Sequence, residues 1–302
     1  MAHTRMHSFL RWVSCCVWLF GVALGLVGCA VRPLVLDTAA DALAAQGHSE
    51  EDDLLLAREA SAFYLKLSES VLRETPGNLK LAESVAGGFT QYAYAFVAFD
   101  AEQMESKDAK AAQKIRERAA RLYGRAFAHA MAALEKSQPG FKQALVAHDP
   151  QLVARFKHSQ VGVAYWAAAS WGGLISLSKD DPDKVADLPL VIDLATLAWK
   201  KDPGYAQGGL TSLMGTLEAS RPGGSVALAQ TYFDQAITQG QGLRAGPWVA
   251  KAENIALPRQ DRTHFTQCLQ EAIRISQIQR NLENEVMRAR ALWLLDMADD
   301  LF

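Results

Sequence analysis

Histidine, cysteine and acidic side chains are the groups in this sequence that could bind a metal ion or transfer a proton. His264 and Cys268 stand four residues apart, so on a helix they would share one face. A structural zinc site needs four ligands, and the seven histidines include no His-Glu-x-x-His motif that could supply the others. We therefore predict no metal site and expect these two side chains to pack within the fold.

Three glutamates are each followed by serine, the arrangement of the catalytic acid in lytic transglycosylases, a helical class of periplasmic enzymes. These are Glu69, Glu83 and Glu105. In that class a Gly-Leu-Met-Gln segment follows at a greater distance, whereas here the nearest counterpart, Gly88–Gln91, comes too soon after Glu83. The chain also has no Gly-x-Ser-x-Gly elbow and no phosphate-binding Gly-Lys-Ser/Thr loop. We predict a protein without catalytic residues or cofactor.

Aromatic residues form the most distinctive pattern of the chain. Phe89, Tyr92, Phe96 and Phe99 follow one another at steps of three, four and three, the spacing of one helical face. Glycines and alanines surround such rings, and small residues beside large ones either leave a tunnel or bring two backbones together. The rings are therefore either core or the wall of a ligand channel. For the channel we single out Phe89, Tyr92, Phe96, Tyr165, Trp166, Trp171 and Trp248.

Helical periodicity runs through most of the chain, and no segment alternates as a strand would. Helices should end at the Pro-Gly pairs that begin at residues 76, 139, 203 and 222. Pro189 should break or kink the helix in which it lies. We predict an all-α fold with helices over about 37–46, 49–75, 78–104, 108–137, 159–178, 181–201, 205–219, 224–239, 247–257, 261–276 and 282–301.

Internal similarity indicates how these helices are organised. The first three Pro-Gly pairs lie 63 and 64 residues apart, close to two helix-turn-helix repeats of about 34 residues. Fragments of a tetratricopeptide pattern occur at Ala119-Tyr123-Ala126, at Ala229-Phe233-Ala236 and, more weakly, at Phe265-Leu269-Ala272. The sequence therefore predicts a tetratricopeptide-like repeat bundle or solenoid of antiparallel helix pairs, forming a single domain over 37–302.

Composition excludes several classes of protein. The 302 residues carry 31 basic and 33 acidic side chains, a formal net charge of −2, so there is no basic excess for nucleic-acid binding. Four cysteines are too few for a disulfide scaffold. We predict no nucleic-acid partner.

The first 28 residues have the composition of a targeting segment. Arg5 and Arg11 precede an uncharged apolar run over 12–28, which ends in Leu26-Val27-Gly28-Cys29. This ending resembles the lipobox of bacterial lipoproteins, in which cleavage precedes a cysteine that becomes lipidated. An ordinary secretory signal and an uncleaved anchor helix are the alternatives. We predict a signal peptide over 1–28, lipidation at Cys29 and a lipidated tether over 29–36.

The segments after the signal peptide resemble the T-component lipoproteins of tripartite ATP-independent periplasmic (TRAP) transporters. The resemblance rests on Ala40–Leu43, Gly88–Phe96, Tyr165-Trp166, Ile175–Pro182, Ala186–Pro189, Ser220–Gly223, Ala245–Trp248, Gln260–Arg262 and Asp299–Phe302. It implies a tetratricopeptide-like fold and association with the solute-binding P-component of the transporter. It also implies a homo-oligomer, such as a trimer, with an internal hydrophobic channel.

These observations lead to one prediction of function and one alternative. The first is a periplasmic lipoprotein that docks the P-component and holds or passes a hydrophobic ligand or carboxylate through its channel. Ala30 stands where an inner-membrane retention signal would usually place Asp, so the lipid anchor should lie in the outer membrane. The alternative is a tetratricopeptide-type envelope assembly lipoprotein that binds other envelope proteins.

Overall fold

The computed structural model describes residues 38–45 and 51–302 of the chain. Over these residues it contains helices and turns but no strand, which confirms the all-α prediction. The predicted signal peptide over 1–28 and the tether over 29–36, with Cys29, lie outside the described residues.

Most helices lie close to the expected ranges, and the Pro-Gly pairs mark several of their ends. The short helices over 141–146 and 151–155 were not among the predicted ranges. Residues 38–45 are helical. The labelled helices are α2 (Leu54–Glu74), α3 (Leu79–Tyr92), the π-helical turn η1 (Ala93–Ala98), α4 (Phe99–Glu105), α5 (Ala109–Ser137), α6 (Phe141–Val146), α7 (Gln151–Arg155), the 3₁₀ turn η2 (His158–Gln160), α8 (Val161–Ser176), α9 (Pro182–Val185), α10 (Leu188–Lys201), the 3₁₀ turn η3 (Tyr205–Gly208), α11 (Gly209–Ser220), α12 (Val226–Gln239), α13 (Gly246–Lys251), the π-helical turn η4 (Ala252–Ala256), α14 (Arg262–Ile278), α15 (Leu282–Asp296) and α16 (Ala298–Leu301).

Local sequence signals explain where several of these helices begin. Asp53, Asn78 and Asp108 each accept a hydrogen bond from a backbone N–H in the first turn of the following helix. The helix expected over 181–201 is divided into α9 and α10, and Pro189 lies in the first turn of α10, as its missing N–H requires. The break that proline was expected to cause is therefore confirmed.

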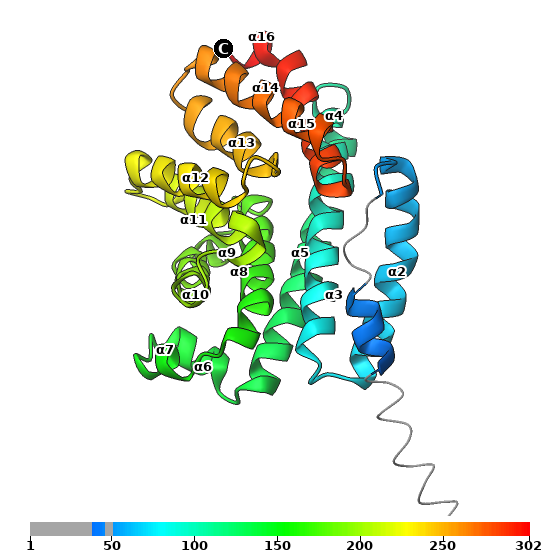
Figure 1. Ribbon diagram of the computed structural model, residues 1–302, viewed down its shortest axis with the longest axis vertical. Coiled ribbons are helices and arrows are strands. Elements are labelled where there is room, and N and C mark those ends of the chain that lie inside the picture. The colour runs from blue at the N-terminus through cyan, green and yellow to red at the C-terminus, as the bar shows by residue number, and fades with distance from the viewer. Residues whose placement is uncertain (1–37, 46–50) are drawn as a thin grey trace, which may run out of the picture.

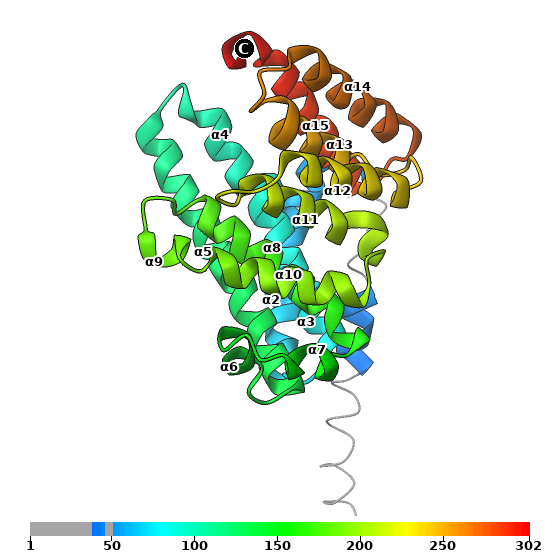
Figure 2. The same cartoon turned by 90° about the vertical axis from the view of Figure 1, so that its left-hand side faces the viewer.

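The helices form a curved stack in which most elements pack against the next one along the chain (Figures 1 and 2). The contacts run from α2 through α3, α5, α8, α10, α11, α12, α13 and α14 to α15. The stack curls so far that α15 also contacts α2, and Arg280 pairs with Asp52 at 2.8 Å. This arrangement is a tetratricopeptide-like solenoid whose last long helix meets its first.

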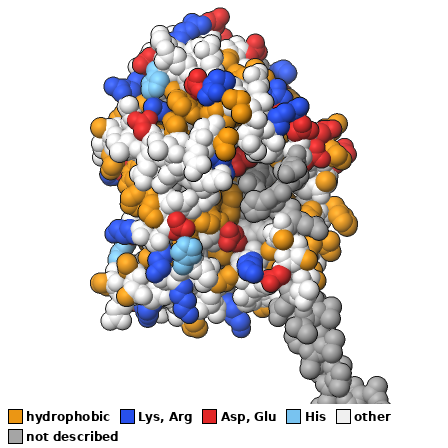
Figure 3. Space-filling view, in the orientation of Figure 1, with side chains coloured by type: hydrophobic (Ala, Val, Ile, Leu, Met, Phe, Trp, Pro, Cys, Tyr) orange, Lys and Arg blue, Asp and Glu red, His pale blue; other side chains and the backbone are white. Residues whose placement is uncertain are grey.

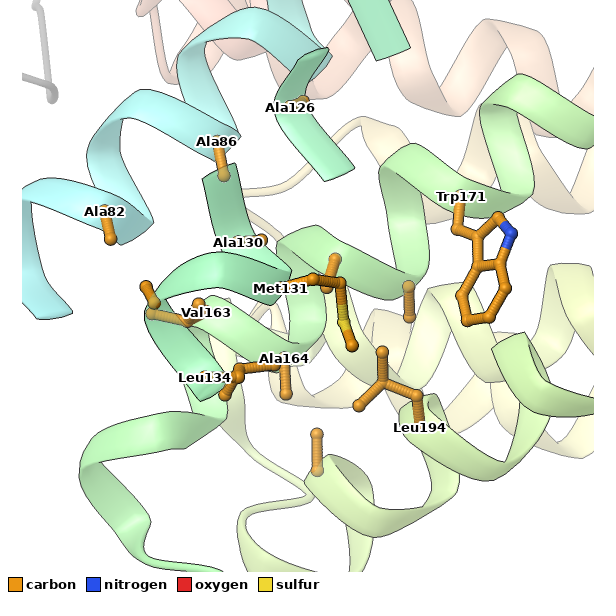
Figure 4. Close-up of a cluster of buried hydrophobic side chains, with 14 of the residues drawn as sticks. Ala82, Ala86, Ala126, Ala130, Met131, Leu134, Val163, Ala164, Trp171 and Leu194 are labelled. Atoms are coloured by element: carbon orange, nitrogen blue, oxygen red, sulfur yellow. The ribbon is translucent and has the colours of Figure 1, made fainter. Parts of the chain in front are cut away.

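Small residues set the spacing of the central helices. Ala82 and Ala86 of α3, Ala126 and Ala130 of α5, and Ala164 of α8 are fully buried in the main hydrophobic cluster (Figure 4). Alanine has no side chain beyond Cβ, so these helices approach closely and larger residues such as Leu134 fill the remaining space. The repeat residues follow the same rule, since Tyr123 and Phe233 are buried between alanines on their own helices, as predicted. Phe265 is buried on the same helix as Leu269 and Ala272.

The apolar residues of α2 are divided between the core and the surface. Leu65 and Leu72 are buried. Leu55, Leu56, Phe63 and Leu67 are exposed instead, Phe63 at 74%. Among the described residues, α2 thus presents an apolar face that no other helix covers.

Candidate ligand-binding site

A cavity of about 2660 Å³ lies within the curve of the helix stack. Its walls include residues of α2, α3, α5, α8, α10, α11, α12 and α15, so helices from both ends of the chain enclose it. Figure 3 shows hydrophobic side chains gathered near the middle of one face of the molecule. The volume exceeds the roughly 300–1,000 Å³ of an ordinary small-molecule pocket.

Tyrosine is the residue that marks this cavity. All seven tyrosines of the chain line it, whereas among the phenylalanines and tryptophans within 38–45 and 51–302 only Phe96 and Trp166 do so. A tyrosine ring can cover apolar surface while its hydroxyl remains hydrated or bonds a polar group. The cavity wall is therefore apolar over much of its area and carries polar atoms at defined points. Its tyrosines are Tyr64, Tyr92, Tyr94, Tyr123, Tyr165, Tyr205 and Tyr232.

Four of the seven aromatic residues singled out from the sequence line the cavity, in two groups. Tyr92 and Phe96 pack edge to face, with their ring centroids 5.5 Å apart. Tyr165 and Trp166 pack at 4.6 Å, and Tyr205 adds a third ring 5.3 Å from Tyr165. The structure thus brings together segments about 70 residues apart in the chain around one space.

The other three selected residues lie away from the cavity. Phe89 is buried and stacks on His129, and Trp171 is buried against Phe127 with ring centroids 4.5 Å apart. Trp248 belongs to the separate hydrophobic cluster of the C-terminal helices, where Lys251 lies over its ring.

A π-helical turn explains why the aromatic stripe divides. Tyr94 and Phe96 lie within η1, where hydrogen bonds span five residues instead of four. The wider turn shifts the residues that follow it around the helix axis, so the regular face expected from Phe89 to Phe99 is not kept. Phe99 packs on Trp293 at 5.4 Å instead of lining the cavity.

Glycines admit two of the cavity's large rings. A Cβ atom on Gly87 would lie 2.7 Å from the indole of Trp166, and one on Gly173 would lie 2.8 Å from the ring of Tyr123. Real Cβ atoms do not approach so closely, so these rings rest directly on the helix backbone. Of the two roles left open for the glycines, close approach is therefore the one seen at these positions.

Glu83 is the acidic group most closely surrounded by the aromatic wall. Its Oε1 accepts a hydrogen bond from the hydroxyl of Tyr205 at 2.5 Å. A Cβ on Gly162 would lie 2.1 Å from its carboxyl group, so only glycine leaves room for the carboxyl there. Within residues 38–45 and 51–302, Glu83 forms no ion pair with a basic side chain. Burial, followed by the charge of Glu83, raises the pKa of Tyr205, so the phenol remains a donor.

Arg244 is the basic group that lies near the same rings. Its Nη2 pairs with Glu283 at 2.5 Å, while its Nε is buried without a hydrogen-bond partner among the described residues. Buried Asn284 fixes the loop, because its Nδ2 donates to Leu243 O and its Oδ1 accepts from Ala245 N, both at 2.9 Å. Burial raises the pKa of Tyr165 to about 12, with a smaller contribution in the same direction from the negative charge of Glu283.

The remaining Glu-Ser candidates are engaged in ion pairs. Burial acts to raise the pKa of Glu69, but hydrogen bonds from Arg125, Lys66 and His129 outweigh it and hold that pKa well below its ordinary value. A carboxylate so stabilised is a poor proton donor. Glu105 pairs with Arg116 and does not line the cavity.

Cys268 is buried among the C-terminal helices, in agreement with the prediction that its side chain packs within the fold. Burial raises the pKa of its thiol to about 11. Among the described residues no three His, Cys, Asp or Glu side chains are grouped closely enough to hold a metal ion.

Arg290 connects the C-terminal helices to the cavity wall. It pairs with Glu253 at 2.6 Å and with Glu102 at 3.0 Å, and its guanidinium lies 5.4 Å from the centre of the Tyr94 ring. Burial acts to lower the pKa of Arg290, but Tyr94 and these two carboxylates outweigh it. Glu253 lies in η4 and Tyr94 in η1, so one arginine contacts both π-helical turns.

Sequence reasoning missed Glu83 as a binding group, and it missed Tyr205, Arg244 and Asn284 altogether. The contrast between tyrosine and phenylalanine was a usable signal, because only tyrosine tolerates a partly hydrated wall. The contact between Glu83 and Tyr205 had no local signal, since 122 residues separate them.

Comparison with known proteins identifies the family. The family model described as the TRAP transporter T-component matches residues 50–302. A protein of Treponema pallidum (strain Nichols) described as uncharacterized is 24% identical over 319 residues, which cover 96% of this chain and 98% of that protein. The crystal structure of a thermophilic TPR protein of Thermus thermophilus aligns with a TM-score of 0.46 at 16% identity, covering 80% of this chain and 93% of that one.

This chain belongs to the TRAP transporter T-component family, as the resemblance in its sequence suggested. It is thus an accessory component of a transporter of the cell envelope. No helix among the described residues has the length and apolar character needed to span a bilayer.

Proposed function

We propose that this protein holds a ligand with a large apolar part in its tyrosine-lined cavity and docks the solute-binding P-component of a TRAP transporter. The ligand would pass between the two proteins without crossing open water. The observation that carries the proposal is the cavity itself, enclosed by helices from both ends of a T-component chain. Its walls combine apolar surface with a few polar groups, as binding pockets usually do.

Few charged groups are available to the polar end of a ligand near the rings of Tyr165, Trp166 and Tyr205. In that part of the wall, a ligand carboxylate, which our functional prediction includes, would have to reach Arg244. Glu283 already pairs with that guanidinium. A hydrophobic ligand needs no such group, and Tyr92, Phe96 and Trp166 supply the surface it would bury.

The exposed face of α2 supports a homo-oligomer. Leu56, Phe63 and Leu67 expose apolar side chains along this helix, and the described part of the chain does not cover them. Contiguous exposed apolar surface of this kind marks interaction sites. We assign this face to the contact between copies in the trimer that the family resemblance implies.

Anchoring would place the assembly at the membrane. Lipidation of Cys29 in the outer membrane remains our proposal, and this residue lies outside the described part of the chain. More than one acyl chain is needed for stable anchoring, which a bacterial lipoprotein provides. Labelling cells with radioactive palmitate tests it: Cys29→Ser should abolish the labelled band and leave the unprocessed precursor. Normal labelling of that variant would contradict the lipobox interpretation.

Two matched substitutions test the cavity and the α2 face separately. Phe96→Gln places a polar group in the cavity wall, and Phe63→Gln makes the same change on the exposed face. Phe96→Gln should weaken calorimetric binding of octanol, whereas Phe63→Gln should leave binding unchanged and shift sedimentation toward monomer. Equal octanol binding by both variants would remove the cavity from the proposal.

Docking needs its own measurement. The full-length chain in lipid nanodiscs should form a complex with the purified P-component of the same transporter, observed as a shared peak in size-exclusion chromatography. Octanol-loaded protein should lose its ligand when the P-component is added in excess. Separate elution at micromolar concentrations of both proteins would contradict docking.

A further inference from the structure

The cavity contains an acidic group that no basic side chain neutralises. Glu83 lines the wall, is half-buried and forms no ion pair within the described residues. One of its oxygens, Oε1, is held by Tyr205. A carboxylate has about four acceptor positions, so this group keeps capacity to accept further hydrogen bonds. Burying a charge without a partner is costly, which makes an unpaired carboxylate in a wall a candidate for binding.

Aromatic rings surround the same place. Tyr205, which holds Glu83, packs on Tyr165, and Tyr165 packs on Trp166. Each neighbouring pair is inclined at 57°, so the three rings do not lie in one plane and present faces in more than one direction. Faces of Trp and Tyr rings attract cations, and clusters of such rings recognise organic ammonium groups.

The charge of the whole cavity favours the same class of ligand. Six acidic and four basic residues line it among the described part of the chain, which leaves a formal charge of −2. Arg244, the basic residue whose charge acts on Tyr165, is already paired with Glu283. A ligand carboxylate at this end would meet the acidic groups of Glu83 and Glu283, while Arg244 is already neutralised by Glu283. A cation would meet an unpaired acid and three rings.

We propose that Glu83, with the rings of Tyr165, Trp166 and Tyr205, binds the ammonium group of an organic cation whose apolar part occupies the remainder of the cavity. This inference rests on the proposed function, because it assumes that the cavity holds an apolar ligand. It changes the expected polar end from a carboxylate to an ammonium ion.

The local structure keeps the carboxyl group in position for this task. The hydroxyl of Tyr205 fixes Oε1, and the bare backbone of Gly162 forms a recess that the carboxyl group occupies. Because the two contacts come from η3 and α8 while Glu83 belongs to α3, three elements define its place. Such preorganisation reduces the entropy that the ligand must overcome on binding.

Three probes with the same tail and different polar ends test the inference. Octyltrimethylammonium, octanoate and octanol are titrated by calorimetry into the full-length chain in lipid nanodiscs, with empty nanodiscs subtracted. The ammonium probe should bind about tenfold more tightly than octanoate, a difference of about 1.4 kcal/mol. This comparison uses the unchanged protein and so does not depend on the folding of a variant.

Substitution of one glutamate locates the effect. Glu83→Gln keeps the size of the side chain and removes its charge, so affinity for octyltrimethylammonium should fall about tenfold while octanol binding is unchanged. Glu271→Gln is the matched control, because Glu271 lies on α14 outside the cavity and pairs with Arg274 at the surface. It should change none of the three affinities.

The outcomes separate this inference from the function on which it rests. If octanol binds but octanoate binds as tightly as the ammonium probe, or if Glu83→Gln and Glu271→Gln behave alike, the ammonium site is wrong and the apolar cavity stands. If none of the three probes binds, the cavity is not a ligand site and both proposals are overturned.

Discussion

Tyr205 donates a hydrogen bond at 2.5 Å to Oε1 of Glu83 and thereby joins η3 to α3, elements 122 residues apart in sequence. Each residue also lines the cavity, so the bond forms part of its wall. Burial, and then the charge of Glu83, raises the pKa of Tyr205, so its hydroxyl serves as the donor in this bond.

Removal of this hydroxyl should cost little stability and should loosen Glu83. Tyr205→Phe keeps the ring contact with Tyr165 and loses one hydrogen bond, so the free energy of unfolding should fall by about 1 kcal/mol. Urea denaturation followed by circular dichroism measures it. A loss as large as that of a deleted core ring would mean that the hydroxyl supports more of the fold than this one contact.

Truncation of rings should separate the cavity wall from the core. Phe141 is fully buried, and Phe141→Ala should cost about 3–5 kcal/mol. Tyr92 is half-buried and borders the cavity, so Tyr92→Ala should cost clearly less, about 1–2 kcal/mol, because part of its ring faces open volume. Melting temperatures of both variants under one buffer give the comparison. Equal losses would place Tyr92 in the core.

Glu69 should make stability fall at acid pH. Its pKa lies below the ordinary value of 4.5 because hydrogen bonds from Arg125, Lys66 and His129 outweigh burial. A group whose pKa is lowered by folding contributes fully above its unfolded pKa, and the contribution is lost as pH falls toward the folded value. Urea midpoints should therefore decline below about pH 4.5, and Glu69→Gln should flatten that decline at a cost of about 2 kcal/mol at pH 7. A parallel decline in both proteins would assign the acid sensitivity to other carboxylates.

Arg290, a buried arginine, should be among the costliest charged residues to replace. Arg290→Met keeps much of the side-chain volume but leaves Glu253 and Glu102 without their shared cation, so unfolding should become easier by about 3–5 kcal/mol. Arg274→Met, which breaks the exposed pair with Glu271, should cost less than about 1 kcal/mol. Similar costs for the two would show that the Arg290 cluster is no stronger than a surface ion pair.

The helices of this protein could be predicted because their signals are local. Asp108 and the Pro-Gly pair after Ser137 bound α5 within a residue or two of the expected range, and Pro189 divides a helix where its missing N–H demands. The π-helical turn at Ala93–Ala98 could not be predicted, because no residue type requires it. Packing against α5 and the C-terminal helices accommodates it.

The cavity could be predicted only in part. Aromatic spacing pointed to Tyr92 and Phe96, and composition pointed to Tyr165 and Trp166, all of which border it. Phe89 shares their spacing, but it is buried and its ring stacks on His129. Glu83 and Arg244 were not recognised as charged groups near one aromatic cluster, because segments so far apart in the sequence meet only through the curvature of the whole stack.

The contact of α15 with α2 has a consequence for how the protein unfolds. Helical repeats usually touch only their neighbours, so an array can fray inward from either end. Here the C-terminal helices cannot separate without breaking the Arg280–Asp52 ion pair, the Arg290 cluster and the wall of the cavity. Fraying of this end and emptying of the cavity are therefore a single event. A bound ligand should accordingly slow hydrogen exchange in α15, far along the chain from the rings it touches.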